Sequence, residues 1–142
     1  MNPTIRKFGY PATLVREYNH WLLLVRPAQV TLGALVLAAK SDATAYHNLP
    51  RVAFTEQADA VAAIERGLAA FCGYERINYL MLMMVDPHVH FHVVPRYSGT
   101  REWDGMAFDD HGWPGLPDLK IATAVSPGQV ERLAADLQNA LR

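Results

Sequence analysis

The chain has one cysteine, Cys72, and no apolar stretch that approaches the length of a membrane span. A single cysteine excludes an internal disulfide, and a helix that crosses a bilayer needs about 20 consecutive, mostly apolar residues. The first ten residues also lack the apolar run of a signal peptide. Because unpaired cysteine is typical of the reducing cytoplasm, we expect a cytoplasmic protein with no membrane partner.

Charge is scarce as well, since charged residues make up 19% of the chain and the formal net charge is −1 at pH 7. Broad binding to nucleic acid depends on a large positive charge, so we predict no nucleic-acid partner. The 142 residues contain no internal repeat, low-complexity tract or linker. They are enough for one domain with a sizeable core, and we predict a single domain over residues 1–142.

The most informative feature is a row of three histidines, His88, His90 and His92, separated by Val89 and Phe91. A period of two is the period of a β-strand, so the three imidazoles would share one face, about 6.6 Å apart from one to the next. Imidazole titrates near neutrality and is costly to bury without partners. The alternation therefore favours a functional row over three structural histidines.

Two functions fit such a row, metal binding and nucleophilic catalysis. On a strand, His88 and His92 would lie about 13 Å apart, too far to share one ion that sits about 2.1 Å from each nitrogen. A metal would take two of the three histidines and would need further ligands, for which His20, His47 and His111 are available. In nucleophilic catalysis one imidazole attacks while its neighbours fix its tautomer. We favour catalysis and expect neither a metal nor another cofactor.

The segment His-Val-His-Phe-His-Val-Val at 88–94 resembles the signature of the histidine triad (HIT) superfamily of nucleotide hydrolases and transferases, in which histidines alternate with hydrophobic residues. Pro95 and Arg96 continue the sequence as in many members, and the resemblance covers about residues 10–105. It implies an α+β fold with a five-stranded antiparallel sheet and two main helices. It also implies a homodimer.

The resemblance assigns a role to each histidine. His90 would attack the α-phosphorus of a nucleotide conjugate and form a covalent nucleotidyl-histidine, while His92 orients His90 and stabilises charge. His88 would donate a proton to the leaving group. The implied substrate is a small nucleotide: a nucleoside phosphoramidate, a dinucleoside polyphosphate or an adenylylated small molecule. The alternative is a module that binds nucleotide with little or no catalysis.

The sequence departs from the family at three positions. Ala34 stands where relatives have a fourth active-site histidine, and Arg26 falls about where a ribose contact belongs. Val85 replaces the Ser or Thr that helps relatives to hold phosphate. Asp86 is then the nearest polar candidate before His88, either to orient that imidazole by a hydrogen bond or to cap the turn.

Three further residues are predicted substrate contacts. Arg96 is suited to bind phosphate as a bidentate donor, and Asn78 lies on the strand that precedes the triad. Trp113 belongs to an irregular stretch, residues 98–118, and its indole would stack on a base or pack. Loops of this length are usually functional or disordered. Its aromatic residues favour order, and we predict that it folds over the site or a partner subunit.

Periodicity and end signals predict the remaining elements. A helix would begin at an N-cap on Thr55 and end at Gly73, and a second would span 126–141 with Ser126, Pro127 and Gln129 forming its start. The expected strands are 13–18, 21–25, 34–39, a long strand 77–85 that meets the triad strand in a tight hairpin at Asp86-Pro87, and a short strand within 120–125.

Overall fold

A five-stranded antiparallel sheet forms the centre of the computed structural model, which describes all 142 residues. Its spatial order is β1-β2-β4-β6-β5, and every neighbouring pair is antiparallel. The strands are β1 (Leu14–Glu17), β2 (Trp21–Val25), β4 (Leu35–Ala39), β5 (Arg76–Leu80) and β6 (His90–Arg96). The predicted α+β fold with a five-stranded antiparallel sheet and two main helices is confirmed.

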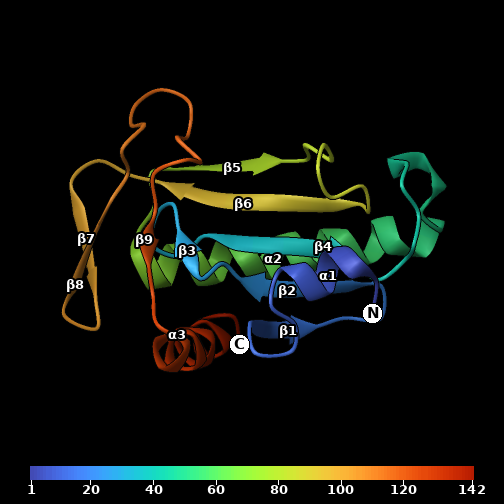
Figure 1. The fold of residues 1–142 in the computed structure, drawn as a ribbon, viewed down its shortest axis with the longest axis horizontal. Coiled ribbons are helices and arrows are strands. Elements are labelled where there is room, and N and C mark those ends of the chain that lie inside the picture. The colour runs from blue at the N-terminus through green and yellow to red at the C-terminus, as the bar shows by residue number, and fades with distance from the viewer.

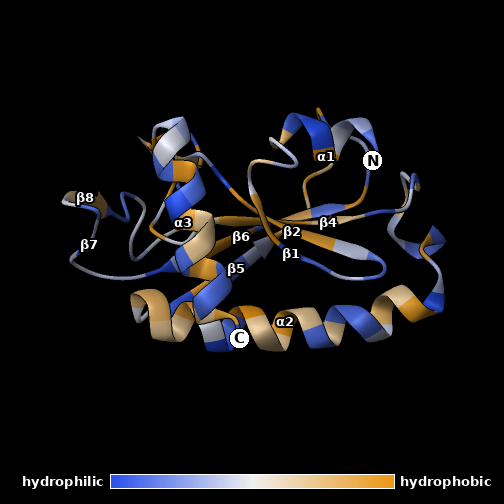
Figure 2. Cartoon of the chain, turned by 90° about the horizontal axis from the view of Figure 1, so that it is seen from below, coloured by the Kyte–Doolittle hydropathy of each residue, from blue (hydrophilic) through white to orange (hydrophobic).

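Helices lie on both faces of this sheet (Figures 1 and 2). The long helix α2 runs along one face, whereas the short helix α1 lies on the other. No helix has the length and apolarity that a bilayer crossing requires. The helices and remaining strands are α1 (Pro3–Lys7), β3 (Ala28–Gln29), the 3₁₀ turn η1 (Tyr46–Asn48), α2 (Arg51–Cys72), β7 (Thr100–Trp103), β8 (Met106–Asp109), β9 (Thr123–Ala124) and α3 (Pro127–Ala140).

The main core lies between the sheet and α2. Side chains that alternate along the strands meet the apolar stripe of the helix, and burying each one contributes about 1.5–3 kcal/mol. The indole nitrogen of Trp21 also donates to the carbonyl of Ala53, at 2.7 Å. This packing commits one face of the sheet to α2 and leaves the other free for the site. Core members include Trp21, Leu23, Val25, Leu35, Leu37, Ile64, Leu68 and Val93.

A smaller core fixes α1 on the opposite face. Ile5 is fully buried there, and Asn2 caps the helix by accepting from the Ile5 amide at 3.0 Å. The Asn2 amide also donates to the carbonyls of Ala39 and Ser41, at 3.2 and 3.1 Å. This helix was not predicted from the sequence. The strand residues beneath it are Leu22, Leu24, Val36 and Ala38.

The predicted long strand 77–85 and its tight hairpin are wrong. β5 ends at Leu80 and β6 begins at His90, so residues 81–89 form an irregular connection. Met83 has a backbone φ of +50°, which no strand residue adopts. The apolar run looked like a buried strand, but three of its side chains are exposed, Leu82, Met84 and Val85, and the others are only partly buried.

The predicted N-cap on Thr55 is also wrong, because α2 begins one turn earlier, at Arg51 after Pro50. Ala53 packs in the core beside Trp21, and this tertiary contact extends the helix. The end at Gly73 is confirmed, with a left-handed φ of +59°. The capping box that begins α3 is confirmed too.

The stretch 98–118 is only half irregular, which corrects the prediction. Its first part is the hairpin β7–β8, which turns at Asp104-Gly105 with φ values of +53° and +72°. Asp-Gly is a strong hairpin signal that the sequence analysis did not use. The short strand expected within 120–125 is present as β9, which pairs with β3.

Candidate active site

The strand β6 carries His90 and His92 in the middle of the sheet. Its register places His90 opposite Ala38 and His92 opposite Val36. Both neighbours belong to the small core under α1, so the two imidazoles lie on the face that α2 leaves free. His88 precedes the strand, which begins two residues later than the triad.

His90 is held in one tautomer by the backbone carbonyl of His88. The residue is 2% exposed, and its Nδ1 lies 2.7 Å from the carbonyl oxygen of His88. A carbonyl oxygen only accepts hydrogen bonds, so Nδ1 carries the proton and donates it. Nε2 of the neutral ring then keeps a lone pair. This is the arrangement that a nucleophilic imidazole requires.

His92 packs edge-on against His90, with ring centroids 5.2 Å apart. Phe8 contacts both rings, at 5.4 and 5.6 Å between centroids. Burial, and then the positive charge of Arg26, lower the pKa of His92 to about 4. Its Nδ1 is buried without a hydrogen-bond partner. A pKa this low leaves His92 uncharged at neutral pH, and its contact with His90 is through ring packing.

Arg26 brings an unpaired positive charge to this face. The Arg26 amide donates to the carbonyl of Ala34 at 3.1 Å, which continues the pairing of β2 with β4. Arg26 is thus in phase with Leu24 and shares the histidine face. Its half-buried guanidinium makes no hydrogen bond or ion pair, and burial lowers its pKa. Its charge acts on His92 from the side of β2.

A cavity of about 170 Å³ opens beside the two imidazoles. Asp86 lines it and forms an ion pair with Lys7 of α1, at 2.9 Å. Nδ1 of His88 lies 2.9 Å from Thr4 Oγ1, so α1 rather than Asp86 holds that imidazole. The complete lining is Leu82, Met83, Met84, Val85, Asp86, His90 and His92.

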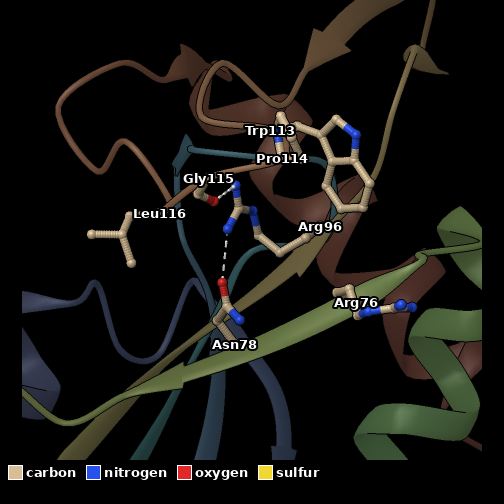
Figure 3. Close-up of a pocket in the computed structure, with 7 residues that line it drawn as sticks. All are labelled: Arg76, Asn78, Arg96, Trp113, Pro114, Gly115 and Leu116. Atoms are coloured by element: carbon tan, nitrogen blue, oxygen red, sulfur yellow. Dashed lines mark hydrogen bonds between the residues drawn. The ribbon is translucent and has the colours of Figure 1, made fainter.

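A second cavity, of about 460 Å³, lies at the other end of β6 (Figure 3). The Arg96 guanidinium donates four hydrogen bonds to protein groups there: to both Asp110 carboxylate oxygens at 2.7 and 3.1 Å, to Asn78 Oδ1 at 2.8 Å and to the Gly115 carbonyl at 2.9 Å. Arg96 therefore anchors the loop after β8. The lining residues are Arg76, Asn78, Arg96, Trp113, Pro114, Gly115 and Leu116.

No family model and no curated protein matches the sequence, but solved structures do resemble this fold. A histidine triad (HIT) protein from Sinorhizobium meliloti 1021 superposes with a TM-score of 0.75 at 17% identity, over 98% of this chain and 94% of that one. A histidine triad protein from Bradyrhizobium japonicum gives 0.70 at 15%, over 100% and 97%. A hypothetical histidine triad nucleotide-binding protein from Sulfolobus tokodaii strain7 gives 0.69 at 16%, over 97% and 89%.

The chain has the histidine triad fold. The resemblance seen in the sequence is thereby confirmed at the level of the fold. The structure contains no group of three His, Cys, Asp or Glu side chains placed to hold a metal ion.

On this histidine triad fold the predicted site residues fall into two groups. His90, His92 and Asp86 line the smaller cavity, whereas His88 does not line it and contacts His90 through its carbonyl. The other predicted contacts, Asn78, Arg96 and Trp113, line the larger cavity instead. Arg96 lies six positions after His90 along the strand, a distance of about 20 Å.

Three residues touch the histidines or act on them in ways that were not predicted from the sequence. Thr4 and Phe8 reach them from α1 and its end. Asn2-Pro3 is a usual helix start that would have marked α1. Arg26 was noted in the sequence only as a departure from the family pattern. Its position two residues after Leu24, in phase with that strand residue, was the available signal that it lies on the histidine face.

Proposed function

We propose that the protein binds a nucleotide conjugate and hydrolyses it, or transfers its nucleotidyl group, through a covalent nucleotidyl-His90 intermediate. The observation that carries the proposal is the contact between His90 Nδ1 and the His88 carbonyl at 2.7 Å, which leaves Nε2 as the nucleophile. The cavity that His90 lines offers a place for a reacting group. No metal takes part in the steps proposed.

In the first step, Nε2 of neutral His90 attacks the α-phosphorus and forms an N–P bond. The bond from phosphorus to the leaving group breaks, and the leaving group departs with the electron pair and takes up a proton, for which His88 is the predicted donor. Positive charge that develops on the His90 ring is stabilised by the hydrogen bond from Nδ1 to the His88 carbonyl. In the second step, water attacks phosphorus and the N–P bond breaks, with its electron pair returning to Nε2. The proton that the water loses returns to the group that protonated the leaving group, for which His88 is the predicted residue. Nucleoside monophosphate is released and neutral His90 is restored.

Negative charge on the phosphoryl oxygens needs a cation, and Arg26 supports that role best. His92 is uncharged at neutral pH because its pKa is lowered to about 4. Arg96 is already bound to Asp110. Arg26 is the unpaired guanidinium whose charge reaches the triad, and a fixed cation in a partly desolvated site stabilises the transition state strongly.

A nucleotide-binding module without turnover is the second candidate. Two departures favour it, since Ala34 and Val85 stand where relatives carry an imidazole and a hydroxyl. Intact-mass measurement after mixing protein with adenosine 5′-phosphoramidate separates the candidates. A transient adduct of one nucleotidyl group, absent in His90→Ala, supports catalysis. Binding of AMP with neither adduct nor released AMP supports the binding module.

The proposal also retains the expected homodimer and cytoplasmic location. β5 is an edge strand, so one row of its backbone N–H and C=O groups is open to pairing with another chain. Light scattering after gel filtration tests the dimer. A mass equal to one 15.8 kDa chain would contradict it.

A further inference from the structure

The segment 82–85 exposes apolar side chains in an unusual way. Met84 is 86% exposed, Val85 81% and Leu82 49%. Isolated exposed aliphatic residues are common, but a contiguous exposed apolar group marks a contact surface. Nothing else in this chain covers the segment.

The position of the segment points to its occupant. Leu82, Met83, Met84 and Val85 wall the same cavity that His90 and His92 line. In an in-line attack the leaving group lies across phosphorus from the His90 nucleophile, and this small space beside His90 is where we place it. The segment joins β5 to β6 ahead of His90, whereas Arg26 acts on His92 from the side of β2. The two features therefore lie on different sides of the nucleophile.

The charge of the cavity lining further restricts which chemical groups could bind in it. Its lining contains no cationic side chain, and its one carboxylate, Asp86, is paired with Lys7 on the rim. A polyphosphate chain needs cationic or amide donors for its many oxygens. Four consecutive apolar side chains offer none, but they favour alkyl or aryl groups through burial of apolar surface.

We propose that residues 82–85 form a subsite for an apolar leaving group. The enzyme would then prefer nucleotide conjugates with an alkyl or aryl leaving group over dinucleoside polyphosphates. This inference rests on the proposed function, because it identifies the residues that would contact the leaving group in the same site.

The test uses three adenosine 5′-phosphoramidates, whose leaving amines are propylamine, hexylamine and 6-aminohexanoate. Burying part of three extra methylenes in an open cavity should raise kcat/KM about 5- to 10-fold from propyl to hexyl. The carboxylate of the third conjugate, which matches hexyl in length, should remove that gain. In the double variant Leu82→Ser/Met84→Ser the hexyl-to-propyl ratio should fall to about 1 while propyl turnover persists.

Val52→Ser is the matched control. Val52 is a 58% exposed valine on α2 that does not line the cavity, so its loss should leave the ratio unchanged. Equal kcat/KM for propyl and hexyl in the native protein would overturn the inference. So would a ratio that survives in the double variant, or a double variant that changes from dimer to monomer, since a second copy would then cover the segment.

Failure of the proposed function has a different signature. If none of the three conjugates is turned over, the proposed catalysis is wrong, and the conjugates can be measured at equilibrium by calorimetry. Tighter binding of hexyl than of propyl, lost in the double variant, would still support the apolar subsite. Equal dissociation constants would overturn it.

Discussion

Nδ1 of His90 lies 2.7 Å from the carbonyl oxygen of His88, so the residue that begins the triad fixes the tautomer of the residue in its middle. Because the donor to that carbonyl must be Nδ1–H, the reactive lone pair is confined to Nε2. The contact uses backbone, and no change of the His88 side chain removes it. The two histidines therefore have separable roles, which variants can distinguish.

His90→Ala should remove turnover of adenosine 5′-phosphoramidate by at least about 10³-fold, because the nucleophile itself is lost. AMP affinity should change only a few-fold, since the cavity and Arg26 remain. Steady-state kinetics and calorimetry measure the two effects. His47→Ala, at an exposed histidine of η1, is the matched control and should behave as native. Equal loss of affinity and turnover would instead point to a binding role for His90.

Arg26→Gln should lower kcat/KM for the same conjugate by about 10²-fold, as expected when a cation that stabilises developing charge is removed from a site. The positive charge of Arg26 helps to hold down the pKa of His92, so that pKa should rise in the variant. Steady-state kinetics measures the change in kcat/KM, and NMR titration of the His92 ring measures the change in its pKa. Arg51→Gln, at an exposed arginine that begins α2, is the control. Unchanged kinetics would mean that Arg26 does not stabilise the phosphate and that another residue makes this contact.

The sequence predicts best the elements whose local signals agree with their tertiary contacts. β2 has the predicted bounds, Trp21–Val25, because a continuous apolar run matches a strand buried on both faces. The start of α3 is predicted by the capping box of Ser126 and Gln129, which needs no distant partner. The pairing of His90 with His92 follows from strand alternation alone.

What could not be predicted depends on distant residues or on exposed apolar side chains. α1 spans Pro3–Lys7, too short for helical periodicity, and its position comes from the bonds of Asn2 to Ala39 and Ser41. The action of Arg26 on His92 depends on the order of β2, β4 and β6. Residues 81–85 were predicted as part of a buried strand because a run of apolar residues has the same sequence pattern whether its side chains are exposed or buried in a core.

Arg96→Lys should reduce stability more than activity. Arg96 is 4% exposed and forms a bidentate pair with Asp110, so the change loses hydrogen bonds in a buried network, at about 2–4 kcal/mol of unfolding free energy. Urea unfolding and limited proteolysis of residues 110–118 measure this loss. If Arg96 acts only as an anchor, kcat/KM at 25 °C stays within a few-fold of native. A much larger fall in kcat/KM would support the predicted phosphate contact.

His92 should make the protein less stable in mild acid. Its pKa is about 4 in the folded chain against an ordinary value of 6.5, so between these pH values the unfolded chain binds more protons. The unfolding free energy should therefore be unaffected above pH 6.5 and should fall as pH drops toward 4. The loss is on the order of 1–3 kcal/mol.

His92→Gln should flatten this dependence, because glutamine does not titrate. Urea unfolding at half-unit intervals from pH 4.5 to 7.5 provides the comparison, with His47→Gln as an exposed control that keeps the native slope. As pH falls, the native protein should lose more unfolding free energy than His92→Gln, so the variant should become relatively more stable. Parallel curves for the two proteins would mean that His92 titrates normally, and it would then be able to carry the charge here assigned to Arg26.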